Sequence, residues 1–254
     1  MTLKKVIKEV QDINTDNDMI LYSNSDSYGV FSQPGNDRPY GKVYGKFIAD
    51  KLGSKFVNRG RSGSCNSRIM RTSTRDLIRL RLENPNKKIQ ALISLATTYR
   101  NESWTEDNQH PEDFDGHFKS FQASSQFRFW STEQKDFAKH WVAQYDNEAE
   151  QTNLLWQVLL LTKTLKSYNI DYLIWWGPKI GVVKPINYDN PFIKDFYQEI
   201  KKDKNILSFE DFGFCTWCLD QGYVPFDKEQ FGEHGHHGPE AQQAFANYLL
   251  ENHL

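Results

Sequence analysis

The chain has 254 residues, a formal net charge of -2 at pH 7, 38% hydrophobic and 14% aromatic residues, and a mean hydropathy of -0.71. This length suits one large domain, and this hydrophobic content excludes general disorder. The small net charge excludes a global attraction to nucleic acid or to an anionic membrane.

Five short apolar segments, each bounded by polar or turn residues, are predicted as strands: residues 19–23, 55–58, 89–95, 171–176 and 205–209. Helical patterns lie at residues 40–52, 66–82, 148–167, 191–202 and 239–252. The alternation of strands and helices predicts crossover connections, and therefore an α/β fold with a mainly parallel sheet and helices on both faces.

Residues 97–130 interrupt this alternation. They are rich in Asn, Glu, Asp, His and aromatic residues and show no period. We interpret them as a long insertion in a single domain that spans residues 1–254. Long loops in compact domains are usually functional, so the insertion is expected to form a lid or substrate wall, or to pack against a partner subunit.

The N-terminal and cysteine patterns bear on location. The first residues lack the continuous apolar run of a signal peptide, and no later run has the length of a membrane span. The three cysteines, Cys65, Cys215 and Cys218, cannot all pair within the chain, which favours a reducing compartment. A soluble cytoplasmic protein is therefore expected.

A serine cluster follows the first predicted strand. Residues 20–29 read ILYSNSDSYG, so an apolar stretch leads into Ser25 and Ser27 and ends at Gly29. In open α/β folds this position lies at the carboxyl edge of the sheet, where active sites are built. A serine hydroxyl becomes a good nucleophile only when a histidine takes its proton and a third group orients that histidine. The alternative is that these residues are ordinary turn formers and helix caps.

The other two residue types occur together near the end of the chain. Residues 232–246 read GEHGHHGPEAQQAFA, an acid followed three residues later by a histidine, before a helical pattern. Glu233 and His236 are therefore the candidate acid and base, and His237 is the alternative base. An early serine with a late acid and histidine predicts one active site.

With this order of elements the chain resembles the SGNH or GDSL hydrolases. That family has a flavodoxin-like, three-layer α/β/α fold, which implies here a mainly parallel five-stranded sheet. Its first block is Gly-Asp-Ser followed by three residues and a glycine. Residues 23–29 match this spacing with Ser25 as the nucleophile, although Ser23 and Asn24 replace Gly and Asp. A second register, Asp26-Ser27, keeps the acid but loses the glycine spacing.

The resemblance also implies an oxyanion hole. The second block looks like residues 58–66, NRGRSGSCN, with Gly63 as a backbone donor and Asn66 as an assisting residue. The third block, Gly-x-Asn-Asp, is replaced by residues 96–102, ATTYRNE, in which Thr98 by position or Asn101 by side chain could substitute. This departure matters because loss of one oxyanion donor costs roughly a hundredfold in rate.

The function implied by the resemblance is that of a serine ester hydrolase, an esterase or carbohydrate O-deacetylase, that acts on a small-molecule or glycan ester and needs no cofactor. The loose blocks also look similar to SGNH-like proteins of tailed phages, so the expected location is cytoplasmic or virion. The alternative is a non-catalytic structural or glycan-binding protein of the same fold, as a homo-oligomer or part of a virion assembly.

Two further patterns carry weaker hypotheses. Cys215 and Cys218, with the histidines downstream, supply enough ligand types for zinc, although the spacing is not that of a zinc finger. Basic residues recur at three- and four-residue steps along the second predicted helix, at Arg68, Arg71, Arg75 and Arg79. This stripe is interpreted as a solvated or salt-bridged face, with an anionic glycan as the alternative partner.

Overall fold

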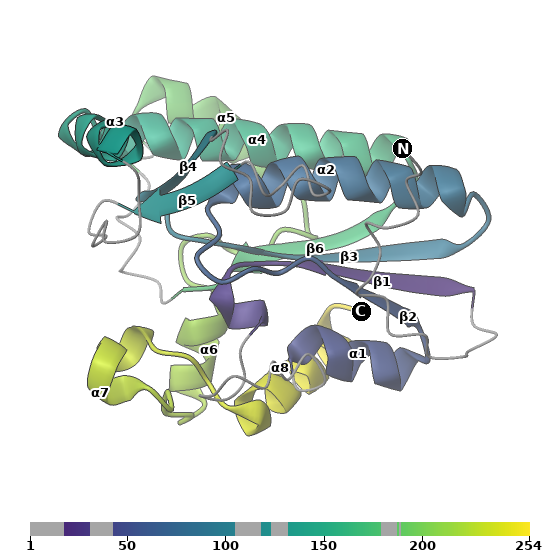
Figure 1. Cartoon of the computed structure of the whole chain (residues 1–254). Coiled ribbons are helices and arrows are strands. Elements are labelled where there is room, and N and C mark those ends of the chain that lie inside the picture. The colour runs from purple at the N-terminus through teal and green to yellow at the C-terminus, as the bar shows by residue number, and fades with distance from the viewer. Residues whose placement is uncertain (1–17, 31–42, 105–117, 123–131, 179–186, 188) are drawn as a thin grey trace.

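The computed structural model describes residues 18–30, 43–104, 118–122, 132–178, 187 and 189–254. A parallel sheet lies between two layers of helices (Figure 1). The sheet has the order β2-β1-β3-β6. Its strands are β1 (Met19–Asn24), β2 (Lys55–Asn58), β3 (Lys88–Leu95) and β6 (Asp171–Trp176). The predicted α/β class, a parallel sheet with helices on both faces, is confirmed.

The two helical layers cover opposite faces of the sheet (Figure 1). The upper layer contains α2 (Asn66–Glu83), α4 (Asn147–Ser167) and α5 (Pro191–Lys201). The lower layer contains α1 (Tyr44–Leu52), α6 (Phe214–Asp220) and α8 (Pro239–Asn252). The predicted start of the first helix, residue 40, lies outside the described residues.

The fifth predicted strand is shorter than expected. The segment around Ile206 forms only two hydrogen bonds to Ile174 of β6. The Ile174 N–H donates to the Asn205 carbonyl, and the Leu207 N–H donates to the Ile174 carbonyl, both at 2.9 Å. The contact is an isolated parallel bridge between Ile174 and Ile206. A turn at Asp203 precedes it and another at Ser208 follows it, so the ladder has no room to extend.

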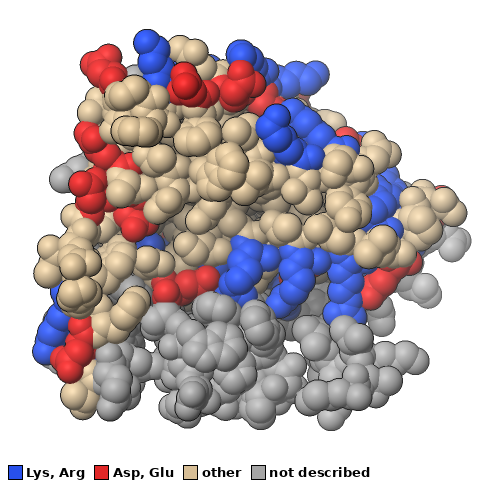
Figure 2. All heavy atoms as spheres, turned by 90° about the horizontal axis from the view of Figure 1, so that it is seen from above, with Lys and Arg blue, Asp and Glu red and all other residues tan. Residues whose placement is uncertain are grey.

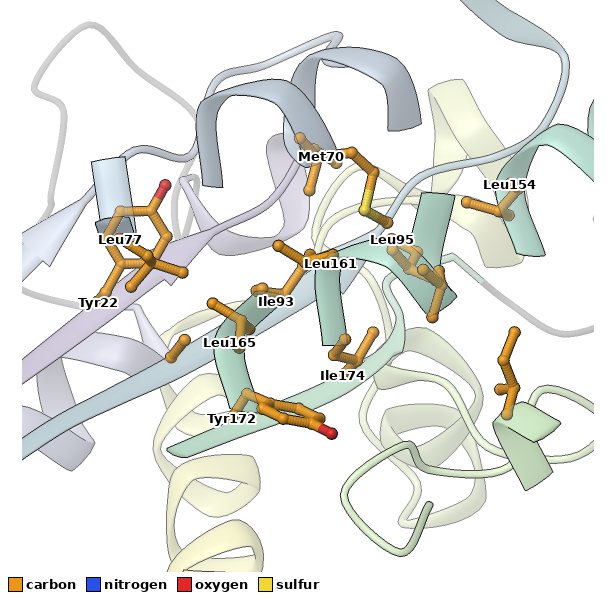
Figure 3. Close-up of a cluster of buried hydrophobic side chains, with 14 of the residues drawn as sticks. Tyr22, Met70, Leu77, Ile93, Leu95, Leu154, Leu161, Leu165, Tyr172 and Ile174 are labelled. Atoms are coloured by element: carbon orange, nitrogen blue, oxygen red, sulfur yellow. The ribbon is translucent and has the colours of Figure 1, made fainter. Parts of the chain in front are cut away.

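Side chains alternate between two buried clusters because successive residues of a strand point to opposite faces. In the upper cluster, Tyr22, Ile93 and Ile174 from the strands meet Leu161 and Leu165 from α4 (Figure 3). The lower cluster is more aromatic and includes Tyr44, Trp175, Phe214 and Phe245. Burial on both faces explains why the strands read as nearly continuous apolar runs.

The insertion contributes an antiparallel pair of strands, β4 (Arg100–Trp104) and β5 (Phe118–Gln122). Sequence patterns did not predict this pair, because β4 begins Arg-Asn-Glu-Ser and has no apolar alternation. It is followed by α3 (Thr132–Ala143). Within the described ranges, no helix combines the length and the apolar character that a membrane crossing requires.

Candidate active site

The first two sequence blocks meet at the carboxyl edge of the sheet. β1 and β2 are neighbouring parallel strands, so the segments that leave them run side by side. The Arg59 N–H donates to the Ser23 carbonyl at 2.8 Å, and the Arg61 N–H donates to the Ser25 carbonyl at 3.1 Å. The serine cluster and the glycine-rich turn therefore lie side by side at this edge of the sheet.

A short helical turn, η2 (Ser27–Gly29), follows β1. Asp26 caps it, because Oδ1 accepts the Tyr28 N–H at 3.2 Å. Ser27 is the first residue of the turn and is 6% exposed. Its hydroxyl makes no hydrogen bond with any residue that the structure describes. Ser27 therefore lies at the head of the turn, and among the described residues its hydroxyl has no hydrogen-bond partner.

Ser25 has a different environment. Its side chain is fully buried, and its hydroxyl donates to the Asp26 carbonyl at 3.0 Å. A Cβ added at Gly29 would lie 2.1 Å from the Ser25 Oγ, and one added at Gly60 would lie 2.8 Å from it. These two glycines leave room for Ser25 and enclose it. Of the two serines predicted from the sequence, Ser27 is the more accessible one.

His236 lies in the loop before α8 and is bonded twice to one acid. Its Nδ1 is 2.5 Å from the Asp227 Oδ2, and its backbone N–H donates to the Asp227 Oδ1 at 2.6 Å. The two side chains are only 21% and 13% exposed. Because Nδ1 faces the carboxylate, Nε2 is the nitrogen that this geometry directs toward general-base chemistry.

Aromatic contacts bring this pair to the serine turn. The His236 ring lies 5.6 Å from the Tyr28 ring, measured between centroids, and stacks at 6.1 Å on Phe226. Tyr28 is the residue directly after Ser27. The loop that carries His236 thus lies against the turn that begins at Ser27.

The acid differs from the sequence-based choice. Glu233 lies on the exposed turn η5 (Gly232–His234), whereas the acid on the His236 ring is Asp227. Asp227 precedes α7 (Lys228–Phe231) and lies nine positions before His236, not three. The expected acid-x-x-His spacing therefore misses it. A search for any acid at the start of the preceding short helix would have included it.

His237, the alternative base, is a core residue. It is fully buried, its Nε2 lies 3.4 Å from the Cys215 Sγ, and its ring packs edge-on against Phe214. Burial lowers the pKa of His237 to about 4, so the ring is neutral at pH 7. These contacts describe a packed imidazole in the lower cluster.

The candidate oxyanion residues also have distinct surroundings. Gly63 lies on an exposed turn in the left-handed conformation, with φ of 75°, which favours glycine. Asn66 is a clamp on the end of β3, because its amide both donates to and accepts from the Ala96 backbone, each at 2.8 Å. The Thr98 hydroxyl lies 3.4 Å from that of Tyr145. The Asn101 side-chain oxygen accepts the N–H of the following residue at 2.8 Å.

The acid before Ser27 belongs to a buried ion pair. Asp26 is fully buried, and its Oδ2 lies 2.8 Å from an Arg100 guanidinium nitrogen. Burial raises the pKa of the Asp26 carboxyl, while the positive charge of Arg100 opposes this shift. The ion pair therefore lies directly beside the candidate nucleophile.

The basic stripe on α2 is largely paired. The Arg68 guanidinium donates to the Arg59 carbonyl and to the Ser64 hydroxyl. The other three members form ion pairs, Arg71 with Glu102, Arg75 with Asp76 and Arg79 with Glu83. On the upper face of the molecule, basic side chains lie beside acidic ones (Figure 2). This agrees with the salt-bridged interpretation of the stripe.

The zinc hypothesis finds no support in the described part of the chain. There, no group of three or more His, Cys, Asp or Glu residues could hold a metal ion. Cys215 and Cys218 are buried in α6, and neither forms a disulfide bond. The His234 side chain lies outside what the structure describes.

No protein family model matches this chain, and no curated protein matches it. In overall structure the chain is similar to a G-D-S-L family protein from Desulfitobacterium hafniense, at 13% identity and a TM-score of 0.48, over 91% of this chain and 98% of that chain. It is also similar to a lipolytic G-D-S-L family member from Veillonella parvula, at 12% identity and a TM-score of 0.45, over 92% of this chain and 98% of that chain. A psychrotrophic esterase from Pseudoalteromonas is similar at 15% identity and a TM-score of 0.43, over 92% of this chain and 96% of that chain.

Proposed function

We propose that this chain is a serine ester hydrolase whose nucleophile is Ser27, whose general base is His236 and whose orienting acid is Asp227. The observation that carries this proposal is the His236–Asp227 pair, held against the residue that follows Ser27. A serine at the head of a turn, a histidine beside that turn and a carboxylate on the far ring nitrogen are the three parts that acyl transfer requires.

In the proposed reaction, the Ser27 Oγ attacks the ester carbonyl carbon while His236 Nε2 takes the hydroxyl proton. The C–O bond to the alcohol then breaks, and His236 returns the proton to the leaving oxygen. Water attacks the acyl-enzyme by the same route and restores Ser27. Throughout, Asp227 keeps the imidazole in one tautomer and stabilises its protonated form.

Negative charge on the carbonyl oxygen needs donors. We assign this role to the backbone N–H groups of Ser27 and Gly63, because both belong to turns at the same sheet edge. Asn66 acts indirectly here, since its amide is committed to the Ala96 backbone. An O-acetylated glycan is the proposed substrate class, on the strength of the family resemblance found in the sequence.

A non-catalytic glycan-binding or structural protein is the second candidate. One observation favours it: Thr98 stands where the family's third block has its asparagine, and the Thr98 hydroxyl faces that of Tyr145. A weaker oxyanion hole lowers the rate by roughly a hundredfold. Such a protein would bind an ester or glycan at this edge without turnover.

Labelling with a serine-reactive fluorophosphonate, alongside hydrolysis of p-nitrophenyl acetate, separates the two candidates. Wild type and Ser25→Ala are expected to be labelled and active, whereas Ser27→Ala and His236→Ala are not. Each variant is compared by circular dichroism and thermal unfolding, so that loss of reaction is not confused with loss of fold. Labelling that survives Ser27→Ala and disappears in folded Ser25→Ala would return the nucleophile to Ser25. Folded wild type that is neither labelled nor active would favour the binding protein.

A further inference from the structure

The insertion strand β4 is fastened to the body of the molecule by two ion pairs. Arg100 and Glu102 are two residues apart, so they lie on the same face of the strand. Arg100 reaches Asp26 at 2.8 Å, and Glu102 reaches Arg71 on α2 at 3.0 Å. The carboxylate side chains are 0% and 8% exposed, respectively. A buried carboxylate is costly unless it is paired, so these contacts stabilise β4 in its place against α2 and the turn that follows β1.

The two oxygens of Asp26 have separate partners. Oδ1 accepts the Tyr28 N–H and thereby caps the turn that begins at Ser27. Oδ2 accepts from the Arg100 guanidinium, which also lies 3.4 Å from the Ser64 carbonyl on the neighbouring glycine-rich segment. Burial raises the pKa of the Asp26 carboxyl, whereas the Arg100 charge and the hydrogen bonds that its oxygens accept favour the ionised form. Asp26 is fully buried, so Arg100 is its charged partner in a site with little contact to solvent.

We propose that Arg100 is a positioning residue of this site: it keeps Asp26 ionised, so that Asp26 can hold the turn that presents Ser27. This inference rests on the proposed function and extends it, because it makes the insertion part of the reaction machinery. Arg100 acts through Asp26 and has no direct role in bond making or breaking.

Several groups from different elements act on Asp26. Arg100 from β4 is its positive neighbour and favours the ionised carboxylate, as does His236, from the loop before α8, whenever its ring is protonated. The phenols of Tyr28 in η2 and Tyr44 in α1 also interact with its charge. Burial raises the pKa of both phenols, so they remain neutral near pH 7. Arg100 is therefore the one permanent positive charge among these four.

The test compares Arg100→Gln, Arg100→Lys, Asp26→Asn and the double variant Asp26→Asn/Arg100→Gln with wild type. Arg71→Gln is the matched control, because it breaks the other ion pair of β4 without touching Asp26. The first measurement is the rate of fluorophosphonate labelling between pH 5 and pH 9. The second is the midpoint of thermal unfolding over the same pH range.

In Arg100→Gln the buried carboxylate loses its permanent counter-charge, so protonation of Asp26 extends to higher pH. The low-pH side of the profile, where the labelling rate rises with pH, is expected to shift to higher pH by about one unit or more. At a fixed pH on this side, the labelling rate should then be about tenfold lower than that of wild type. Arg100→Lys keeps the positive charge and should keep this side of the profile near its wild-type position. The double variant has no carboxyl group at position 26 and should return this side of the profile toward wild type.

A loss of rate in Arg100→Gln that is equal at every pH, or equal to that of Arg71→Gln, would overturn the proposal. The unfolding data separate this failure from failure of the proposed function. Arg100→Gln is expected to raise the folded-state pKa of Asp26 further, so its thermal unfolding midpoint should fall relative to that of wild type as the pH rises. The double variant, which has no carboxyl group at position 26, should lack this trend. If wild type is never labelled but this trend is present, the hydrolase assignment fails while the Arg100–Asp26 assignment stands. Absence of the trend would overturn that assignment.

Discussion

Replacement of Asp227 by Asn tests the catalytic assignment most directly. The carboxylate accepts from the backbone N–H of His236 and faces the ring Nδ1 of the same residue. Asparagine can keep the first bond. Its NH₂ group, however, donates to Nδ1 and forces the ring proton onto Nε2. The histidine is then a donor where the reaction needs an acceptor.

The size of the effect follows from this geometry. Loss of a charge-assisted hydrogen bond costs about 1.5–3 kcal/mol, or about 10- to 100-fold in rate. The tautomer change adds to this, and the equivalent exchange in a serine protease triad lowers the rate by about 10⁴. We therefore expect Asp227→Asn to react about 10²- to 10⁴-fold more slowly than wild type.

The assay is the initial rate of p-nitrophenyl acetate hydrolysis, together with the rate of fluorophosphonate labelling. Glu233→Gln is the matched control, because Glu233 is an exposed acid in the turn η5, close to His236 in the sequence. This variant is expected to react within about twofold of wild type, as surface substitutions usually have small effects. If folded Asp227→Asn kept more than half of the wild-type rate while Glu233→Gln lost it, Asp227 would not be the orienting acid.

Three further predictions concern stability, each measured by urea unfolding. Leu155→Ala, at a fully buried position of α4, should lower the free energy of unfolding by about 2–5 kcal/mol, whereas Leu160→Ala, at a 45% exposed position, should change it by less than about 0.5 kcal/mol. Asn66→Ala removes two hydrogen bonds to the buried Ala96 backbone and should lower the free energy of unfolding by about 2 kcal/mol or more. A decrease below about 0.5 kcal/mol would show that these hydrogen bonds do not stabilise the end of β3. The pKa of His237 is lowered to about 4 in the folded protein, so the neutral ring contributes to the free energy of unfolding above about pH 6.5 and this contribution is lost as the pH falls. The loss should reach about 3 kcal/mol at pH 4. It should be absent in His237→Gln.

Much of the fold follows from local patterns in the chain. The predicted helix at residues 66–82 is α2 (Asn66–Glu83), and the predicted helix at 148–167 is α4 (Asn147–Ser167). Both are long enough to show a helical period, and both bury one side against the sheet. In contrast, α6 has only seven residues and was missed, since so short a segment shows no period. The polar strand β4 was missed because ion pairs, not apolar alternation, hold it in place.

The site was predicted less completely than the fold. Ser27 and Ser25 were both candidates, because a motif spacing cannot tell which hydroxyl faces outward. In the structure Gly29 and Gly60 enclose Ser25, which is why Ser27 is the proposed nucleophile. The candidate acid, Asp227, was not considered, because the chain between it and His236 has to fold back before the two residues meet.

The sequence by itself predicted the strands of the parallel sheet and the long helices, and it indicated a serine near one end and a histidine near the other as candidate site residues. Periodicity and turn chemistry are local properties, so they can be read along the chain. Only the tertiary structure decided which acid bonds His236, which serine is enclosed, and how Arg100 from the insertion reaches Asp26. These outcomes depend on distances between segments far apart in the sequence. They also depend on burial, because a buried charge without a partner is strongly destabilising.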